Sequence, residues 1–309
     1  MAIWETYLRG FRDYLRLERS VAGHTLQAYL HDVRSFASFL EAEGREISPA
    51  EADAGLLGSY LGALRSLGME ASTQARMLSG LRAFFRYLIL EGIIQQNPAD
   101  LVDGPRLGRR LPSYMTQDEI GRMLDIFDLS TAEGQRNRAM VELMYGCGLR
   151  VSEACGLRIS DLFFSEGFIR VRGKGNKERL VPVGRSAVRQ VSLYLEGTRP
   201  SYPQQRSASD LLFLNRSGKG ISRVSVFKMV KAAAADCGLP STLGPHTLRH
   251  SFATHLVEGG ADLRAVQAML GHASITTTEI YTHLDRTYLR DEILSHHPLE
   301  RRRRKLIQE

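Results

Sequence analysis

The sequence lacks several features that mark common classes of protein. It has three cysteines, Cys147, Cys155 and Cys237, with neither CxxC spacing nor an even count, a pattern that indicates reduced packing thiols rather than disulfides or metal ligands. No apolar run approaches the length of a membrane span, and the first twenty residues lack the basic-then-apolar layout of a signal peptide. We therefore expect a cytoplasmic protein that does not act in a membrane.

Lysine is absent from the first third of the chain. Residues 1–107 hold 11 Arg, no Lys and 13 Asp or Glu, a net charge of −2, whereas residues 108–309 hold 30 Lys or Arg and 21 Asp or Glu, a net charge of +9. The basic character thus belongs to the second part of the chain, and a polyanion such as DNA is its natural partner. If the charge is considered by itself, a basic surface that keeps the protein soluble explains it equally well.

Residues 1–103 show helical patterns only. Apolar stripes at i, i+3, i+4 spacing run from Leu26 to Leu40 and from Met77 to Leu88. A capping box at Ser48–Glu51, with Pro at the first helical position, predicts another helix start. The polar face of the 77–88 helix either contacts DNA phosphates and base edges or is a solvated arginine face. Its members are Arg76, Ser79, Arg82 and Arg86.

The stretch 97–113 contains three prolines and two glycines, which break helices and predict an inter-domain linker at 104–113. If two domains clamp DNA, Arg106, Arg109 and Arg110 are placed to follow a phosphate backbone. A second capping box, Thr116–Glu119, opens a domain that runs from 114 to 309.

The second domain has mixed patterns. Segments 168–172 and 179–183 flank GKGNKE and predict a β-hairpin. Helices are expected at about 117–127, 135–145, from 152, and at 184–196, 221–237, 246–258, 261–269, 274–283 and 287–295. The predicted fold class is therefore mainly α, with a small β-sheet in the second domain.

Cationic side chains recur at turns and helix starts of this domain. His246 and Arg249 share one face of a helix start, where the helix dipole favours an anion. Arg150 lies in a glycine-containing turn before a helix, and Glu153 is either its buttress or an ordinary first-turn acid. Two fixed arginines can hold one phosphate by bidentate hydrogen bonds.

Three further residues supply proton transfer and a nucleophile. Lys174 lies between two glycines in the hairpin turn, where it either protonates a leaving oxygen or is an ordinary exposed lysine, and Lys177 is the second choice for that role. His272 precedes Tyr281, whose hydroxyl can attack phosphorus. Since neither an Asp/Glu/His metal cluster nor a glycine-rich nucleotide loop accompanies them, the set predicts metal-free phosphoryl transfer through a phosphotyrosine.

The chain contains five separated segments in this order: GLRVSEACGL, VRGKGNKER, HTLRHSFATHL, LGHASITTTEIYTHL and HHP. In the order and spacing of these segments the chain resembles the tyrosine recombinases of the Xer type, and the resemblance covers nearly the whole chain. The resemblance implies a helical, SAM-like core-binding domain and a catalytic domain that form a C-shaped clamp, and it implies no cofactor, metal or ATP. It also implies roles for six residues: scissile-phosphate binding by Arg150, Arg249 and His272, protonation of the 5′ oxygen by Lys174, assistance from His246, and attack by Tyr281.

The same resemblance implies partners. They are a double-stranded recombination site, a second Xer-type recombinase in a tetramer, and an activating DNA translocase of the division machinery, for the resolution of chromosome dimers. A C-terminal helix at about 287–309, with the stripe Leu289, Ile293 and Leu294, is expected to dock on a neighbouring protomer; otherwise it folds back and Arg301–Arg304 form a basic tail. The alternatives are a phage or conjugative-element integrase, a type IB topoisomerase and a DNA-binding protein with a decayed site.

Overall fold

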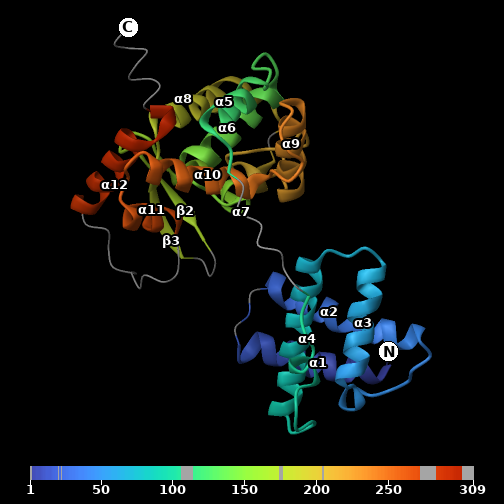
Figure 1. The fold of residues 1–309 in the computed structure, drawn as a ribbon. Helices are drawn as coiled ribbons and strands as arrows, with labels where there is room; N and C mark the ends of the chain where they lie inside the picture. Colours follow the sequence, from blue (N-terminus) through green and yellow to red (C-terminus); the bar gives the residue numbers. More distant parts are fainter. Residues whose placement is uncertain are drawn as a thin grey trace. The chain divides into compact units, whose positions relative to one another are not determined.

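The chain forms two compact units, Met1–Arg110 and Leu111–Glu309, in a computed structural model (Figure 1). The structure describes residues 2–19, 21, 23–105, 114–173, 177–203, 205–271 and 283–300. Arg106, Arg109 and Arg110 lie outside these residues, as do Lys174, His272 and Tyr281. The division between the units falls inside the proline-containing stretch 97–113.

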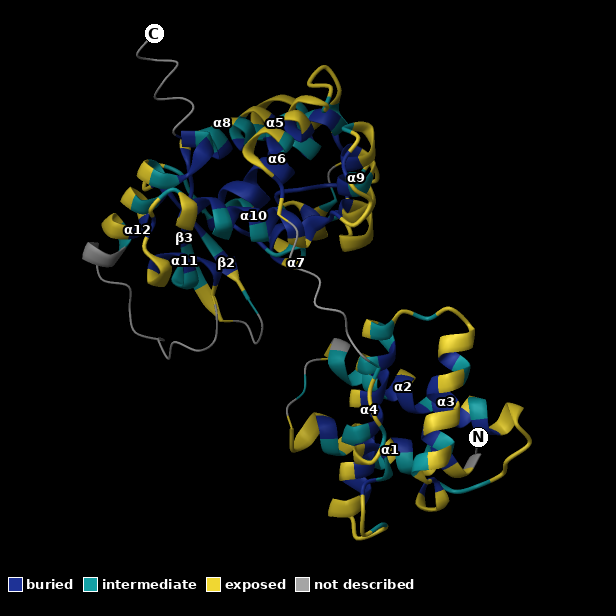
Figure 2. Ribbon diagram, viewed as in Figure 1, coloured by how far each residue is buried: buried dark blue, intermediate teal, exposed yellow. Residues whose placement is uncertain are grey.

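The first unit is a bundle of helices around an aromatic core. The Trp4 ring packs on Phe84 at 6.0 Å and meets the edge of Phe36 at 5.7 Å between centroids. Both predicted apolar stripes point inward, and Figure 2 shows the exposed residues on the outer faces of the helices. The elements are α1 (Ala2–Leu17), α2 (Gly23–Ala42), α3 (Ala54–Ser66), α4 (Ala71–Leu90) and two 3₁₀ turns, Pro49–Glu51 and Pro98–Asp100.

The capping box at Ser48 starts only a short turn. The Ser48 amide donates to Glu51 Oε2 at 2.7 Å, as the sequence predicts, but the 3₁₀ turn ends at Glu51. Ala52 and Asp53 are extended, and Asp53 Oδ1 accepts a hydrogen bond from the Leu56 amide at 2.8 Å. The predicted helix start is therefore confirmed only as a 3₁₀ turn, and the α-helix α3 begins at Ala54, behind the Asp53 cap.

The second unit packs helices around a three-stranded antiparallel sheet of order β1-β2-β3. The predicted hairpin is confirmed: β2 pairs with β3, with Ile169 opposite Val181 and Val171 opposite Arg179. The strands are β1 (Leu162–Phe163), β2 (Phe168–Arg172) and β3 (Glu178–Pro182). The α-helices are α5 (Gln117–Asp125), α6 (Ala132–Gly146), α7 (Val151–Gly156), α8 (Arg185–Leu193), α9 (Arg223–Asp236), α10 (Pro245–Glu258), α11 (Leu263–Leu270) and α12 (His283–His296).

These helices match most of the predicted segments. α8 continues as a π-helical turn, Tyr194–Thr198, and short 3₁₀ turns occupy Ile159–Asp161, Arg199–Ser201 and Arg206–Ala208. The helix predicted at 274–283 lies almost entirely outside the described residues. Over the described ranges, no helix combines the length and the apolar character needed to cross a membrane.

Helix α12 packs against its own unit. Leu289 and Ile293 are buried in the same core as α10 and α11, and α12 contacts β3. After the helix, the His297 ring lies 4.8 Å from Tyr145 and 5.7 Å from Phe252 between centroids. Exchange of this helix between protomers stays a prediction, but its apolar stripe no longer supports it, because the chain covers that stripe itself.

Candidate active site

Arg150 is the N-cap residue of α7 and follows a tight turn. The turn needs Gly148, whose φ is +60° and whose added Cβ would lie 2.5 Å from the Phe252 ring. The Arg150 amide and Nη1 both donate to Glu153, at 2.8 and 2.9 Å. Glu153 is therefore the buttress that the sequence allowed, and it holds the backbone and the guanidinium of Arg150 together.

Arg249 reaches the same place from α10. Its Nη1 donates to the Gly148 carbonyl and its Nη2 to the Leu270 carbonyl, both at 2.6 Å. Burial, followed by the charge of Arg150, lowers the pKa of Arg249 to about 10. The guanidinium thus stays cationic at neutral pH while two carbonyls fix its plane.

Glu153 is buried and joins three arginines. Its oxygens accept from Arg179 Nη1 and Nη2 at 2.8 and 2.9 Å, and its Oε2 lies 3.8 Å from Arg249 Nη1. Burial raises the pKa of Glu153, but the hydrogen bonds and charge of Arg179 and the bonds from Arg150 outweigh it, so the pKa lies below its ordinary value. The carboxylate is therefore ionised at neutral pH.

We call Arg150, Glu153, Arg179 and Arg249 the Glu153 cluster. It contains three positive charges and one negative charge, a net charge of +2. Arg150 is the most exposed member, with 39% of its side chain accessible, against 9% for Arg179. An anion that approaches Arg150 and Arg249 therefore finds an uncompensated positive charge at a partly buried place, where electrostatic attraction is weakly screened.

The other predicted residues lie around this cluster or outside the described residues. His246 is exposed at the start of α10, three residues before Arg249. The Leu270 carbonyl that holds Arg249 is followed by Gly271, which ends α11 with a φ of +66°. Lys174, His272 and Tyr281 themselves lie outside the described residues, so the structure places Arg150, His246 and Arg249 of the predicted six.

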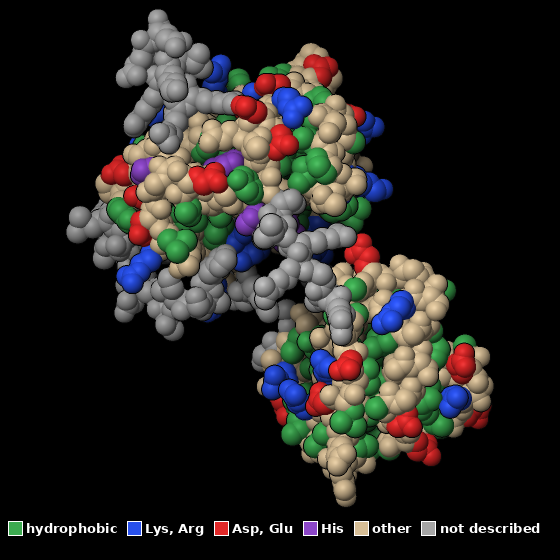
Figure 3. All heavy atoms as spheres, in the orientation of Figure 1, with side chains coloured by type: hydrophobic (Ala, Val, Ile, Leu, Met, Phe, Trp, Pro, Cys, Tyr) green, Lys and Arg blue, Asp and Glu red, His purple; other side chains and the backbone are tan. Residues whose placement is uncertain are grey.

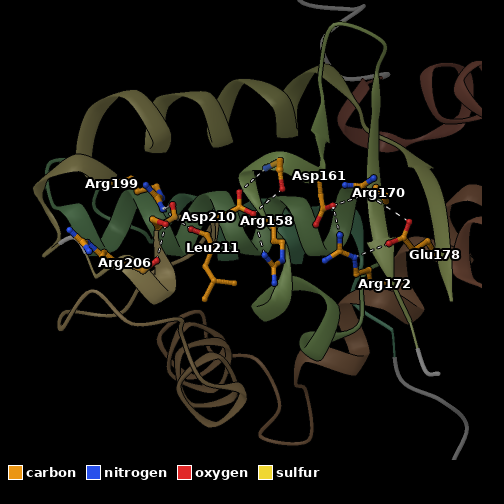
Figure 4. A network of polar contacts seen from close by, with 11 residues as sticks. Arg158, Asp161, Arg170, Arg172, Glu178, Arg199, Arg206, Asp210 and Leu211 are labelled. Atoms are coloured by element: carbon orange, nitrogen blue, oxygen red, sulfur yellow. Dashed lines mark hydrogen bonds and ion pairs between the residues drawn. The ribbon is translucent and has the colours of Figure 1, made fainter. Parts of the chain in front are cut away.

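Hydrogen bonds join the two strands of the hairpin that carries Lys174 close to its turn. The Gly173 amide donates to the Lys177 carbonyl at 2.7 Å, and Arg172 Nε donates to Glu178 Oε1 at 2.9 Å across the strands. Figure 4 shows Arg170 and Arg172 converging on Asp161, a buried carboxyl 2.8 and 3.5 Å away. Lys177 is exposed where the hairpin turn rejoins β3.

Arg179 was missed by the sequence reasoning. It stands opposite Val171, two residues before Val181, and both valines are buried. Side chains two apart in a strand share a face, so an arginine on the apolar face of the hairpin was the available signal. Such an arginine must meet a buried acceptor, which here is Glu153.

The side chains of the predicted polar face of α4 differ in their contacts: some bond to other parts of the protein, and some are exposed. Arg76 Nη1 donates to the buried Asp32 at 2.8 Å, and Arg82 donates to the carbonyls of Ala99 and Val102 at 3.0 and 3.1 Å. The Ser79 hydroxyl donates to the Ala75 carbonyl at 2.9 Å. Arg76, Ser79 and Arg86 are exposed. On the face drawn in Figure 3, Lys and Arg side chains are interspersed with Asp and Glu rather than gathered in one patch.

Family models match both units of the chain. The model described as "Phage integrase family" matches residues 113–287, and the model "Phage integrase, N-terminal SAM-like domain" matches residues 8–92. The tyrosine recombinase XerD of Chlorobaculum tepidum is 42% identical over 299 residues, 96% of this chain and 97% of that protein. XerD of Staphylococcus aureus is 38% identical over 295 residues, 95% and 99% of the two chains.

A solved structure agrees with these relatives. The XerH site-specific recombinase bound to a palindromic difH substrate, in a post-cleavage complex, superposes with a TM-score of 0.69 and 27% identity, over 89% of this chain and 81% of that one. Fold and sequence together define a site-specific DNA recombinase of the tyrosine type. The chain belongs to the phage integrase family, and the predicted Xer type is confirmed by its relatives.

Proposed function

We propose that this recombinase binds the scissile phosphate between Arg150 and Arg249 and attacks it with Tyr281. The observation that carries the proposal is the Glu153 cluster, which holds these two arginines at one place with a net positive charge. Guanidinium groups fixed in this way bind phosphate oxygens and stabilise the charge of the pentavalent transition state.

Strand cleavage is a transesterification. The Tyr281 oxygen forms a bond to phosphorus, and the bond between phosphorus and the 5′ oxygen breaks. Lys174 gives its proton to that oxygen, His246 assists transfer of the proton that the Tyr281 hydroxyl releases, and His272 donates a hydrogen bond to the phosphate. A tyrosine hydroxyl has a pKa of about 10, so neighbouring cations are needed to favour its ionised form. The 5′ hydroxyl of a second strand then displaces the tyrosine and restores a phosphodiester without an energy source.

The two units together are proposed to hold the duplex. The exposed Arg86 on α4 and the linker residues Arg106, Arg109 and Arg110 would contact phosphates, and Arg76 would add to them at its exposed edge. Linking two weak DNA-binding units raises the effective concentration of the second. Full-length protein should therefore bind a site more tightly than fragment 1–103 or fragment 114–309.

The assembly proposed is a cytoplasmic tetramer on two duplexes with a second Xer-type recombinase. Its support is the similarity to XerD proteins over almost their full length. Resolution of chromosome dimers at cell division, with activation by a DNA translocase, is the corresponding cellular role. Integration of a mobile element by the same chemistry is the alternative, and footprinting on the replication-terminus region of its own chromosome distinguishes the two.

The test is Tyr281→Phe on a nicked recombination site. Wild-type protein should leave an SDS-resistant protein–DNA adduct, because the nick lets the 5′ fragment leave before religation. The variant should form none, while its affinity for the site stays within about twofold, since most affinity comes from phosphate contacts. An adduct with the variant would assign the nucleophile to another residue.

A further inference from the structure

We infer that Arg179 is a positioning residue for recognition of the scissile phosphate, acting through Glu153 on Arg150 and Arg249. The inference rests on the proposed function of the Glu153 cluster and adds a residue outside the six catalytic candidates. Arg179 itself is turned away from solvent, with 9% of its side chain accessible.

Arg179 uses its donors within the protein. Nη1 and Nη2 bind the two oxygens of Glu153 at 2.8 and 2.9 Å, and Nε binds the Met269 carbonyl at 2.9 Å. A planar guanidinium can make this bidentate contact, whereas a lysine ammonium cannot. The side chain thus ties β3 to the acid of α7 and to the end of α11.

The partners of Glu153 explain what Arg179 contributes. Oε1 accepts from both Arg150 and Arg179, whereas Arg249 Nη1 stays 3.8 Å from Oε2, beyond hydrogen-bond distance. Without Arg179, the ionised carboxylate would draw Arg150 and Arg249 toward itself, and the net charge of the cluster would fall from +2 to +1. Both changes weaken the hold on a phosphodiester. Arg179 therefore donates the hydrogen bonds that the Glu153 carboxylate needs, so the positive charge of Arg150 and Arg249 remains available to the substrate phosphate.

Arg179 and Arg249 both donate hydrogen bonds to the end of α11. Arg179 donates to the Met269 carbonyl and Arg249 to the next carbonyl, that of Leu270. An added Cβ on Gly271 would lie 3.0 Å from Arg179 Cδ, so the arginine fills the space beside this left-handed turn. Loss of Arg179 removes one of two adjacent anchors and loosens the plane in which Arg249 is fixed.

The experiment compares Arg179→Lys with Arg170→Lys in full-length protein. Arg170 is the matched control because it lies on the adjacent strand and also pairs with a buried carboxyl, Asp161, at 2.8 Å (Figure 4). It is not a member of the Glu153 cluster. Single-turnover cleavage is measured on nicked sites that carry either the normal scissile phosphodiester or a methylphosphonate. The methylphosphonate lacks the negative charge that the cluster neutralises.

Arg179→Lys keeps the net charge of the cluster but loses the bidentate contact with Glu153, so it should cleave the phosphodiester about 10- to 100-fold more slowly than wild type. On the methylphosphonate its rate, relative to wild type on the same substrate, should fall less than about threefold. Arg170→Lys should stay within about twofold on both. Equal loss on both substrates would assign Arg179 a structural role only, and no loss on either would assign it none; both results overturn the inference.

Two further measurements keep these outcomes separate. Thermal unfolding is recorded for each variant. If the lysine variant is unfolded at the assay temperature, it is replaced by Arg179→Gln, which keeps a donor for the Met269 carbonyl. The same selective loss of phosphodiester cleavage is expected for Arg179→Gln. Tyr281→Phe is run on the normal substrate. An adduct from Tyr281→Phe would reject the proposed function, whereas an equal loss by Arg179→Lys on both substrates would reject only the role of Arg179.

Discussion

Asp32 of the first unit and Glu153 of the second are both buried beside arginine, and their pKa values shift in opposite directions. Asp32 of the first unit pairs with Arg76 alone among the ion pairs of the described residues, and burial, the largest effect, raises its pKa. Glu153 of the second unit meets three arginines, and its pKa is lowered. The pair of Asp32 and Arg76 joins α2 to α4, whereas the Glu153 cluster has an excess of positive charge that a ligand can balance. Of these two sites, only the one with an excess of positive charge can attract an anionic ligand.

The largest effect expected is that of Arg249→Ala. Loss of one fixed donor to the transition state should slow cleavage about 1,000-fold, while affinity for the DNA site changes little. Arg76→Ala, which breaks the pair with Asp32, should lower thermal stability and leave the cleavage rate of the folded protein within about threefold. Single-turnover cleavage and thermal unfolding of the two variants check this contrast, and equal rate losses would remove the distinction between the two carboxylates.

A loss of about 100-fold is expected for Lys174→Ala, a typical contribution of a general acid. A substrate with a bridging sulfur at the 5′ position should restore the rate, because a thiolate leaves without protonation. Lys177→Ala is the matched control, since the Lys177 carbonyl closes the same turn. Rescue of Lys177→Ala instead of Lys174→Ala would assign the acid to Lys177.

His297 is a buried base that pairs with no carboxylate among the described residues, so it shows how burial alone shifts a pKa. Burial, followed by the charge of His255, lowers the pKa of His297 to about 3. Between pH 6.5 and 3 the unfolded chain therefore binds a proton that the folded chain does not, so stability is full above pH 6.5 and falls as the pH falls. At pH 5 the loss should be about 2 kcal/mol. Unfolding of His297→Phe should lose this part of the pH dependence; an unchanged slope would contradict the assignment.

The smallest effect is expected on α4. Arg86→Ala should weaken DNA binding a few-fold and lower the salt slope of the affinity by about one. Arg82→Ala should instead reduce stability, because Arg82 holds the carbonyls of Ala99 and Val102. Binding measured over a range of salt concentrations distinguishes the two; the same slope for Arg86→Ala and wild type would make the α4 face an ordinary solvated surface.

Local patterns predicted most of the secondary structure, since apolar spacing and turn residues fix helices and hairpins within a few residues. The differences have tertiary causes. The capping box at Ser48 could not reveal that Asp53 caps the α-helix α3. The stripe with Leu289 could not reveal that its own unit buries it, so exchange of this helix between protomers stays a prediction. In the site, spacing pointed to Arg150, His246 and Arg249, whereas Arg179 acts through a partner 26 residues away, a contact that periodicity does not encode.

The most direct test of the proposed cleavage chemistry is to identify the residue and the DNA end in the trapped adduct of wild-type protein. The adduct on a nicked site is digested with protease and nuclease, and the remaining nucleotide-linked peptide is sequenced by mass spectrometry. A single linkage between the Tyr281 oxygen and a 3′ phosphate is expected. Linkage through another residue, or to a 5′ phosphate, would contradict this chemistry.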